Sequence, residues 1–113
     1  MKGSDSFLIV LETPKGERSF TCHRNEFIWN AAAHNGITLP AICHQGRCLT
    51  CAGCVLSGSF DQSSANSYFP EDKVEGYILL CTAKPCSDLR LRTNQQHAMR
   101  QYRAKLGLPA PYL

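Results

Sequence analysis

The sequence predicts a small α+β fold in which one helix packs across a mixed β-sheet. The chain has 113 residues, of which 43% are apolar, and this is enough for the core of one domain. Segments with the two-residue alternation of strands surround one segment with helical spacing. The expected order is strand, strand, helix, strand, helix, strand, strand. No apolar run reaches the ~18 residues that a membrane-spanning helix requires, so we expect no membrane span.

The N-terminal segments indicate a β-hairpin followed by a helix. Ser6–Thr13 alternates, a stretch with turn composition follows, and residues 18–23 alternate again. The helix is expected over residues 27–35 because its apolar side chains recur at helical spacing. We expect Asn25 to be its N-cap and Gly36 to be its left-handed stop.

The remaining elements of the domain are short. In chain order we expect a strand, a helix with proline in its first turn, a buried strand that carries a cysteine, and an alternating strand at the sheet edge. These four elements span residues 52–57, 70–75, 77–80 and 89–92. Residues 61–67 are polar and aperiodic, so they predict a loop.

Seven cysteines stand out in the composition, and their odd number excludes complete pairing in disulfides. They are Cys22, Cys43, Cys48, Cys51, Cys54, Cys81 and Cys86. The second, third and fourth follow the spacing C-x4-C-x2-C, and Cys81 comes after 29 further residues. A loop with three thiolates can surround one side of two sulfide-bridged irons, and a distant segment can supply the fourth thiolate. This spacing is typical of plant-type [2Fe–2S] proteins.

Three other uses of the cysteines remain open at this point. A disulfide scaffold would be accompanied by a secretory signal, which the sequence does not show. A zinc site could be built from two cysteine pairs. These pairs would be Cys51 with Cys54 and Cys81 with Cys86. A redox dithiol at Cys48 and Cys51 would need a helix N-terminus, which this loop of glycine and polar residues does not predict.

The sequence around the cysteines adds to the motif. Its notable stretches are Leu39-Pro40, Ala52-Gly53, Val55-Leu56-Ser57-Gly58 and Glu75-Gly76-Tyr77-Ile78-Leu79-Leu80. With these stretches, the chain resembles the plant-type [2Fe–2S] ferredoxins from about residue 7 to residue 93. The resemblance implies a β-grasp fold, a [2Fe–2S] cluster, and the transfer of single electrons to larger redox enzymes by a protein that is not itself an enzyme. The iron ligands that it implies are Cys43, Cys48, Cys51 and Cys81.

The charge of the chain departs from this family, whose members are generally acidic. The formal net charge is +3, and the C-terminal residues 82–113 hold six Lys or Arg against one acid. Gln96 and His97 stand where the family has two acids. Only Glu71 and Asp72 remain of its acidic turn. Because complementary charge selects partners, we expect redox partners with an acidic docking surface. The basic and aromatic residues are too few to predict nucleic-acid binding, and we expect a monomer.

Residues 94–113 extend beyond the ferredoxin domain, which we place at residues 1–93. A helix capped by Asn94 is expected to end near Leu106, with Gly107 as its stop. The side chains expected to face the core or a partner are Ala98, Met99, Tyr102 and Leu106, and those expected to face water are Arg100, Arg103 and Lys105. The extension is similar to that of a ferredoxin subtype of cyanobacteria and chloroplasts, which implies the cytoplasm or the chloroplast stroma. It either caps the fold or docks a partner.

Other residues have simpler interpretations. Cys22 is expected to pack as a small apolar residue. Cys54 and Cys86 are expected to be buried; the alternatives are that they pair with each other or replace a lost ligand. Tyr68 matches an aromatic residue that lies beside the cluster in the family, although packing explains it equally well. The histidines expected at the surface are His23, His34 and His97. The alternative function is a regulatory or cluster-delivery protein, since three cysteines exceed the four implied ligands.

Overall fold

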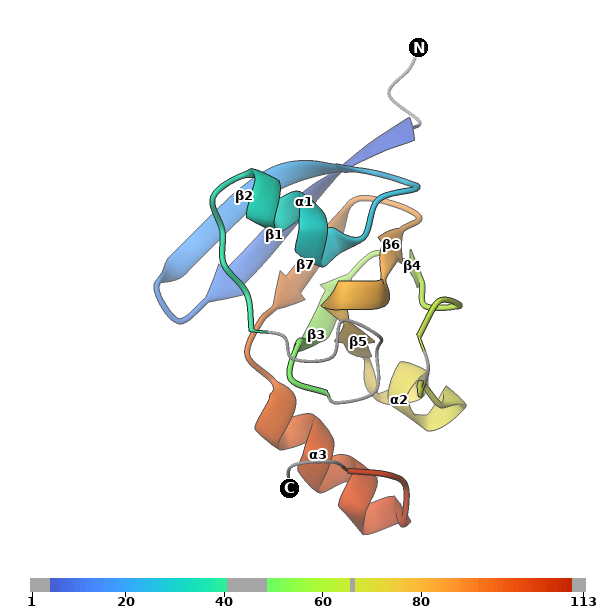
Figure 1. The fold of residues 1–113 in the computed structure, drawn as a ribbon. Coiled ribbons are helices and arrows are strands. Elements are labelled where there is room, and N and C mark those ends of the chain that lie inside the picture. The colour runs from blue at the N-terminus through green and yellow to red at the C-terminus, as the bar shows by residue number, and fades with distance from the viewer. Residues whose placement is uncertain (1–4, 41–48, 66, 111–113) are drawn as a thin grey trace.

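The computed structural model describes residues 5–40, 49–65 and 67–110 of the chain. In chain order its elements are β1 (Ser6–Thr13), β2 (Gly16–His23), α1 (Ile28–His34), β3 (Ala52–Ser57), β4 (Phe60–Asp61), α2 (Pro70–Glu75), β5 (Tyr77–Leu79), the 3-10 helix η2 (Leu80–Thr82), β6 (Lys84–Pro85), β7 (Leu89–Arg92) and α3 (Gln96–Leu106). This is the α+β fold that the sequence predicts, with one helix across a mixed sheet as in a β-grasp (Figure 1).

The main sheet has five strands in the order β2-β1-β7-β3-β5. β1 is antiparallel to β2, as the expected hairpin, and parallel to β7. The prediction that β7 is an edge strand is wrong, because β7 lies between β1 and β3. Leu89 and Leu91 are buried, and Arg90 Nε lies 3.0 Å from Glu12 Oε2 on β1. An alternation of four residues does not reveal whether a strand has one neighbour or two. The buried leucines and the ion pair with β1 are consistent with the inner position of β7.

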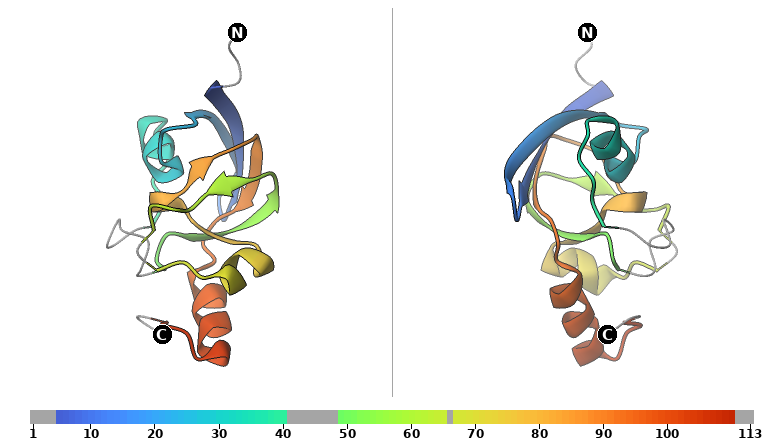
Figure 2. Two further views of the ribbon diagram at one scale, coloured as in Figure 1. Left: turned by 90° about the vertical axis from the view of Figure 1, so that its right-hand side faces the viewer. Right: turned by 60° about the vertical axis from the view of Figure 1, so that its left-hand side comes forward.

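α1 packs across one face of the sheet (Figures 1 and 2) and buries Ile28, Ala31 and Ala32. The helix begins at Ile28, and no side chain caps it, so the predicted N-cap at Asn25 is wrong. The N–H of Ile28 donates instead to the backbone oxygen of Ala83, at 2.9 Å. This acceptor comes from a distant segment, and it satisfies one of the free N–H groups of the first turn.

The strand expected over residues 77–80 ends at Leu79, and Cys81 lies on η2. The side chain of Gln62 pairs with the last residue of this strand. Its Oε1 accepts from the N–H of Leu79 at 2.9 Å, and its Nε2 donates to the oxygen of Leu79 at 3.0 Å. Gln62 therefore occupies the place of a neighbouring strand. It follows β4, which pairs with β6 in a second sheet that is too short for sequence periodicity to predict.

α3 lies beyond the end of the main sheet, on the side of α2 (Figures 1 and 2). It ends at Gly107, which adopts φ 72° as the predicted left-handed stop. The predicted N-cap at Asn94 is wrong, because no side chain caps α3. Asn94 instead adopts φ 60°, and its Oδ1 accepts from the hydroxyl of Thr93 at 2.6 Å. The chain therefore turns sharply between β7 and α3.

The buried face of α3 differs from the expected one. Met99, Arg100 and Arg103 are buried, whereas Leu106 is exposed. The prediction that Arg100 and Arg103 face water is therefore wrong, because both guanidinium groups have partners in the domain. Lys105 is exposed, as expected. None of the helices in the described ranges has the length and apolar character needed to cross a membrane.

Candidate iron–sulfur cluster site

Two of the four implied ligands lie in the described part of the chain, and their sulfur atoms meet. Cys51 precedes β3 and Cys81 lies on η2, yet their Sγ atoms are 3.0 Å apart. Only 2% of Cys51 and 3% of Cys81 is exposed. Cys43 and Cys48 lie outside the described residues. The fold therefore brings together two buried thiols that the sequence separates by 30 positions.

Backbone contacts hold the two cysteine segments in place. The N–H of Leu80 donates to the oxygen of Cys51 at 3.3 Å, and the N–H of Ala52 donates to the oxygen of Leu49 at 3.1 Å. Leu49 adopts φ 68°, a left-handed conformation that costs a side chain of this kind about 1–3 kcal/mol. Its side chain is completely buried, which contributes about 1.5–3 kcal/mol. Burial of Leu49 can therefore offset the strain in the turn before Cys51.

Gln62 fixes the Cys81 segment from another side. Besides its two bonds to Leu79, its Nε2 donates to Thr82 Oγ1 at 3.0 Å. These contacts bracket Cys81 on both sides in the sequence, and Gln62 is only 9% exposed. Sequence reasoning missed this residue because an isolated glutamine in a polar, aperiodic stretch carries no pattern.

The pair of thiols fits part of an iron–sulfur site. Iron–sulfur clusters are held by cysteine thiolates, and Cys51 and Cys81 offer two buried sulfurs 3.0 Å apart. The alternative zinc site would use four described cysteines, but no three His, Cys, Asp or Glu side chains converge among the described residues. The structure therefore contradicts that zinc arrangement.

The other described cysteines stand apart from this pair. Cys22 is buried as expected, and burial, followed by the negative charge of Glu26, raises the pKa of its thiol to about 12. Cys54 is half-buried and Cys86 is exposed, so the prediction that both are buried is wrong. Cys86 directly follows β6, and its N–H still donates to the backbone oxygen of Ser59 at 3.0 Å.

Comparison with known proteins shows the family of the chain. A family model described as the 2Fe-2S iron-sulfur cluster binding domain matches residues 12–86. The chain belongs to the plant-type [2Fe–2S] ferredoxins. It is 38% identical to Ferredoxin-2 of Synechococcus sp. over 81% of this chain and 86% of that protein. It is 34% identical to the chloroplastic Ferredoxin-6 of Zea mays over 78% of this chain and 57% of that protein.

A solved structure gives the same fold. The crystal structure of Pectocin M2 matches 90% of this chain with a TM-score of 0.74 and 25% identity, and this match covers 39% of the pectocin chain. The ferredoxin thus spans just over half of its maize relative and well under half of Pectocin M2. The family and the named relatives identify the protein as a carrier of electrons on a [2Fe–2S] cluster.

Tyr68 of the ferredoxin is held by packing contacts. Its hydroxyl donates to the oxygen of Tyr77 at 2.5 Å, and its ring meets Phe60 edge-on at 6.2 Å. Burial, followed by the negative charge of Asp72, raises the pKa of Tyr68. The hydroxyl therefore stays protonated and acts as a donor. The location of Tyr68 beside the cluster stays a prediction.

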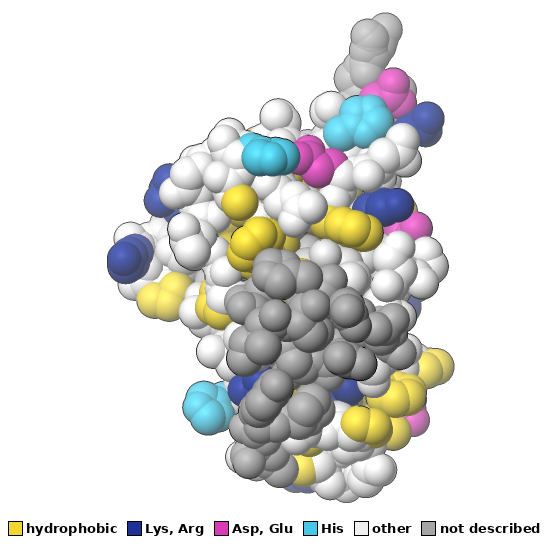
Figure 3. Space-filling model, in the orientation of Figure 1, with side chains coloured by type: hydrophobic (Ala, Val, Ile, Leu, Met, Phe, Trp, Pro, Cys, Tyr) yellow, Lys and Arg dark blue, Asp and Glu magenta, His cyan; other side chains and the backbone are white. Residues whose placement is uncertain are grey.

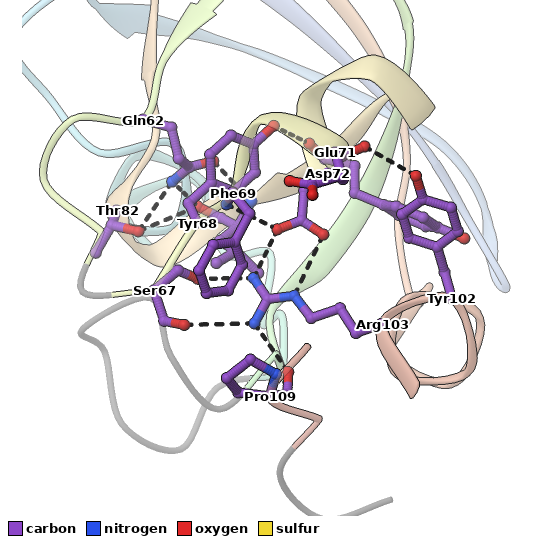
Figure 4. Close-up of polar contacts among 12 residues, drawn as sticks. Gln62, Ser67, Tyr68, Phe69, Glu71, Asp72, Thr82, Tyr102, Arg103 and Pro109 are labelled. Carbon is purple, nitrogen blue, oxygen red and sulfur yellow. Dashed lines mark hydrogen bonds and ion pairs between the residues drawn. The ribbon is translucent and has the colours of Figure 1, made fainter. Parts of the chain in front are cut away.

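Arg103 joins α3 to α2 (Figure 4). Its Nη2 and Nε lie 2.8 and 3.2 Å from the two oxygens of Asp72, and both side chains are 0% exposed. It also donates to the backbone oxygens of Ser67 and Pro109, at 2.7 and 3.1 Å, and lies 4.9 Å from the ring centroid of Phe69. This bidentate pair is geometrically specific, and the Asp72 carboxylate in it is buried.

Arg100 extends from the same helix to the segment that contains Cys51. Its Nη2 donates to Thr50 Oγ1 at 3.0 Å, and Thr50 directly precedes Cys51. Only 7% of Arg100 is exposed. Sequence reasoning missed both arginines, although Met99 and Arg103 are four residues apart and therefore share a face of a helix.

Proposed function

We propose that Cys43, Cys48, Cys51 and Cys81 bind the [2Fe–2S] cluster through their thiolates. The observation that carries the proposal is the 3.0 Å approach of the buried sulfurs of Cys51 and Cys81. The C-x4-C-x2-C spacing supports the assignment of the other two ligands. Bound at these residues, the cluster supplies one-electron redox chemistry. The protein itself holds the cluster in place and performs no bond chemistry.

Cysteine variants of the anaerobically purified protein test this assignment. We expect the wild type to contain iron and acid-labile sulfide and to absorb in the visible range. Cys81→Ser should lose or strongly alter this absorption, since it removes a proposed ligand. Cys86→Ser is the matched control, because Cys86 is exposed and should leave the spectrum unchanged. Absence of acid-labile sulfide from the wild type, or an unaltered cluster in Cys81→Ser, would show that the assignment is wrong.

We also propose that the ferredoxin donates electrons to a redox enzyme with an acidic docking surface. The net charge of +3 supports this choice, as do Gln96 and His97 at positions where the family has acids. Asp72 does not contribute a free negative charge, since Arg103 pairs with it inside the protein. Figure 3 shows one face of the molecule, and among the residues described there the Asp and Glu side chains are few and scattered. The basic residue that α3 exposes is Lys105, so the burial of the two arginines makes the positive surface smaller than the sequence suggests.

Electron transfer to one acceptor in two charge states tests this partner chemistry. Stopped-flow measurements would compare basic cytochrome c with the same cytochrome after succinylation of its lysines. We expect faster reduction of the succinylated form at low ionic strength, and a rate that falls as salt screens the attraction. An acidic ferredoxin is the reference and should show the opposite preference. Faster reduction of the unmodified cytochrome would refute the proposal.

The remaining assignments concern organisation and compartment. We propose residues 1–93 as the ferredoxin domain, residues 94–113 as its C-terminal extension, and a monomer in solution. The names of relatives from a cyanobacterium and a chloroplast support the cytoplasm or the chloroplast stroma as the compartment. Light scattering during size-exclusion chromatography checks the monomer, and a mass near 25 kDa in place of 12.5 kDa would contradict it.

A further inference from the structure

The C-terminal extension reaches the segment that contains Cys51. The N–H of Gln95, just before α3, donates to the backbone oxygen of Ala52 at 3.0 Å. One and a half turns further along, Arg100 donates to Thr50 Oγ1 at 3.0 Å. The two contacts therefore fix the residues on either side of Cys51. An element outside the family's usual length thus supports a proposed ligand.

Arg100 brings a positive charge to this segment inside the protein. Only 7% of Arg100 is exposed, and charges interact more strongly in the protein interior than in water. Adding an electron makes a cluster more negative. A fixed cation nearby consequently stabilises the reduced form more than the oxidised form, which raises the reduction potential. Charge and hydrogen bonding around a cluster are known to set that potential.

The hydrogen bond also orients Thr50. A hydroxyl group has one proton to donate and two acceptor positions. Because Arg100 has only donors, Thr50 must act as the acceptor in this contact. Its own proton therefore points away from the guanidinium group.

We propose that Arg100 is a positioning residue that raises the reduction potential of this ferredoxin, through its charge and through its hold on Thr50. The inference rests on the proposed function, in which Cys51 is a cluster ligand. It assigns the C-terminal extension a role in electron transfer itself. The extension is then part of the electron carrier, in addition to capping the fold.

Potentials of full-length, cluster-loaded variants test the proposal by spectroelectrochemical titration. Arg100→Gln removes the charge, and we expect the electron-transfer equilibrium to shift at least tenfold toward the oxidised form, a potential lower by about 59 mV. Arg100→Lys keeps the charge and should recover most of the shift. Lys105→Gln is the matched control, because it removes the same charge from an exposed position of the same helix. We expect it to shift the equilibrium less than twofold.

Thr50→Val keeps the shape of the side chain and removes the acceptor. We expect at least a twofold shift in the same direction and an altered electron paramagnetic resonance signal of the reduced protein. This variant also serves if Arg100→Gln does not fold. The inference is overturned if Arg100→Gln binds the cluster with the potential of Lys105→Gln, or, where that variant fails to fold, if Thr50→Val has the wild-type potential. Failure of the proposed function is distinct, because the wild type would then contain no acid-labile sulfide.

Discussion

Arg103→Met removes the guanidinium group that ties the C-terminal extension to α2. Arg103 and Asp72 are both 0% exposed, and their ion pair is 2.8 Å long. Methionine is flexible and apolar and donates no hydrogen bond. The substitution therefore leaves the Asp72 carboxylate without its cation and the backbone oxygens of Ser67 and Pro109 without this donor.

Removing one partner of a buried ion pair costs about 3–5 kcal/mol. For a domain near 100 residues, each kcal/mol lowers Tm by roughly 4 °C at the least. We therefore expect Arg103→Met to melt at least about 12 °C below the wild type. The measurement is thermal unfolding of the cluster-loaded protein under nitrogen, followed by far-ultraviolet circular dichroism. Lys105→Met, on the exposed side of the same helix, should change stability by less than about 0.5 kcal/mol.

Two results would refute this reasoning. The first is an Arg103→Met protein that melts within about 2 °C of Lys105→Met, since the pair would then contribute almost nothing. The second comes from a double-mutant cycle with Asp72→Asn. If an unpaired charge causes the loss, Asp72→Asn must cost less in the Arg103→Met background than in the wild type. Strictly additive costs would contradict the coupling.

Three further predictions concern other parts of the fold. Because burial raises the pKa of Cys22 to about 12, iodoacetamide at pH 8.5 should modify exposed Cys86 and spare Cys22, as mass spectrometry of the peptides will show. Equal alkylation of the two thiols would contradict the raised pKa of Cys22. Because that folded-state pKa exceeds the ordinary value of 9.0, the contribution of the Cys22 thiol to stability is complete below pH 9 and is lost as pH rises toward 12. Gln62→Leu leaves the N–H of Leu79 without its acceptor, at about 1–3 kcal/mol for a buried group, and should speed loss of visible absorption at 50 °C. An unchanged rate would show that Gln62 does not hold the Cys81 segment. Gly58→Ala combines φ 101° with a Cβ that would clash with the backbone oxygen of Asp88, and it should cost about 2–5 kcal/mol in urea unfolding. Gly36→Ala has φ 77° without a close contact and should cost only about 1–2 kcal/mol; similar costs would refute the role of the contact.

Local patterns predicted the elements that local forces dominate. The alternation of residues 6–13, the strand over residues 52–57 and the helix over residues 70–75 have the predicted bounds. Gly107 ends α3 as predicted, because a left-handed residue without a Cβ is a local requirement. The two predicted caps failed for a common reason. At the start of each helix a backbone N–H donates to an oxygen from a distant part of the chain: Ile28 to Ala83 before α1, and Gln95 to Ala52 before α3.

The sequence by itself determined the cofactor class, because the number of thiolates and their spacing are chemical facts that do not depend on coordinates. It also determined the family and the α+β fold. The tertiary structure alone decided which distant groups meet: Cys51 with Cys81, Gln62 with Leu79, Arg103 with Asp72, and Arg100 with Thr50. A cationic side chain on a helix is expected to face water on average. Arg103 is buried because a carboxylate and two carbonyl oxygens from elsewhere in the fold compensate its loss of hydration, and no pattern within α3 encodes those partners.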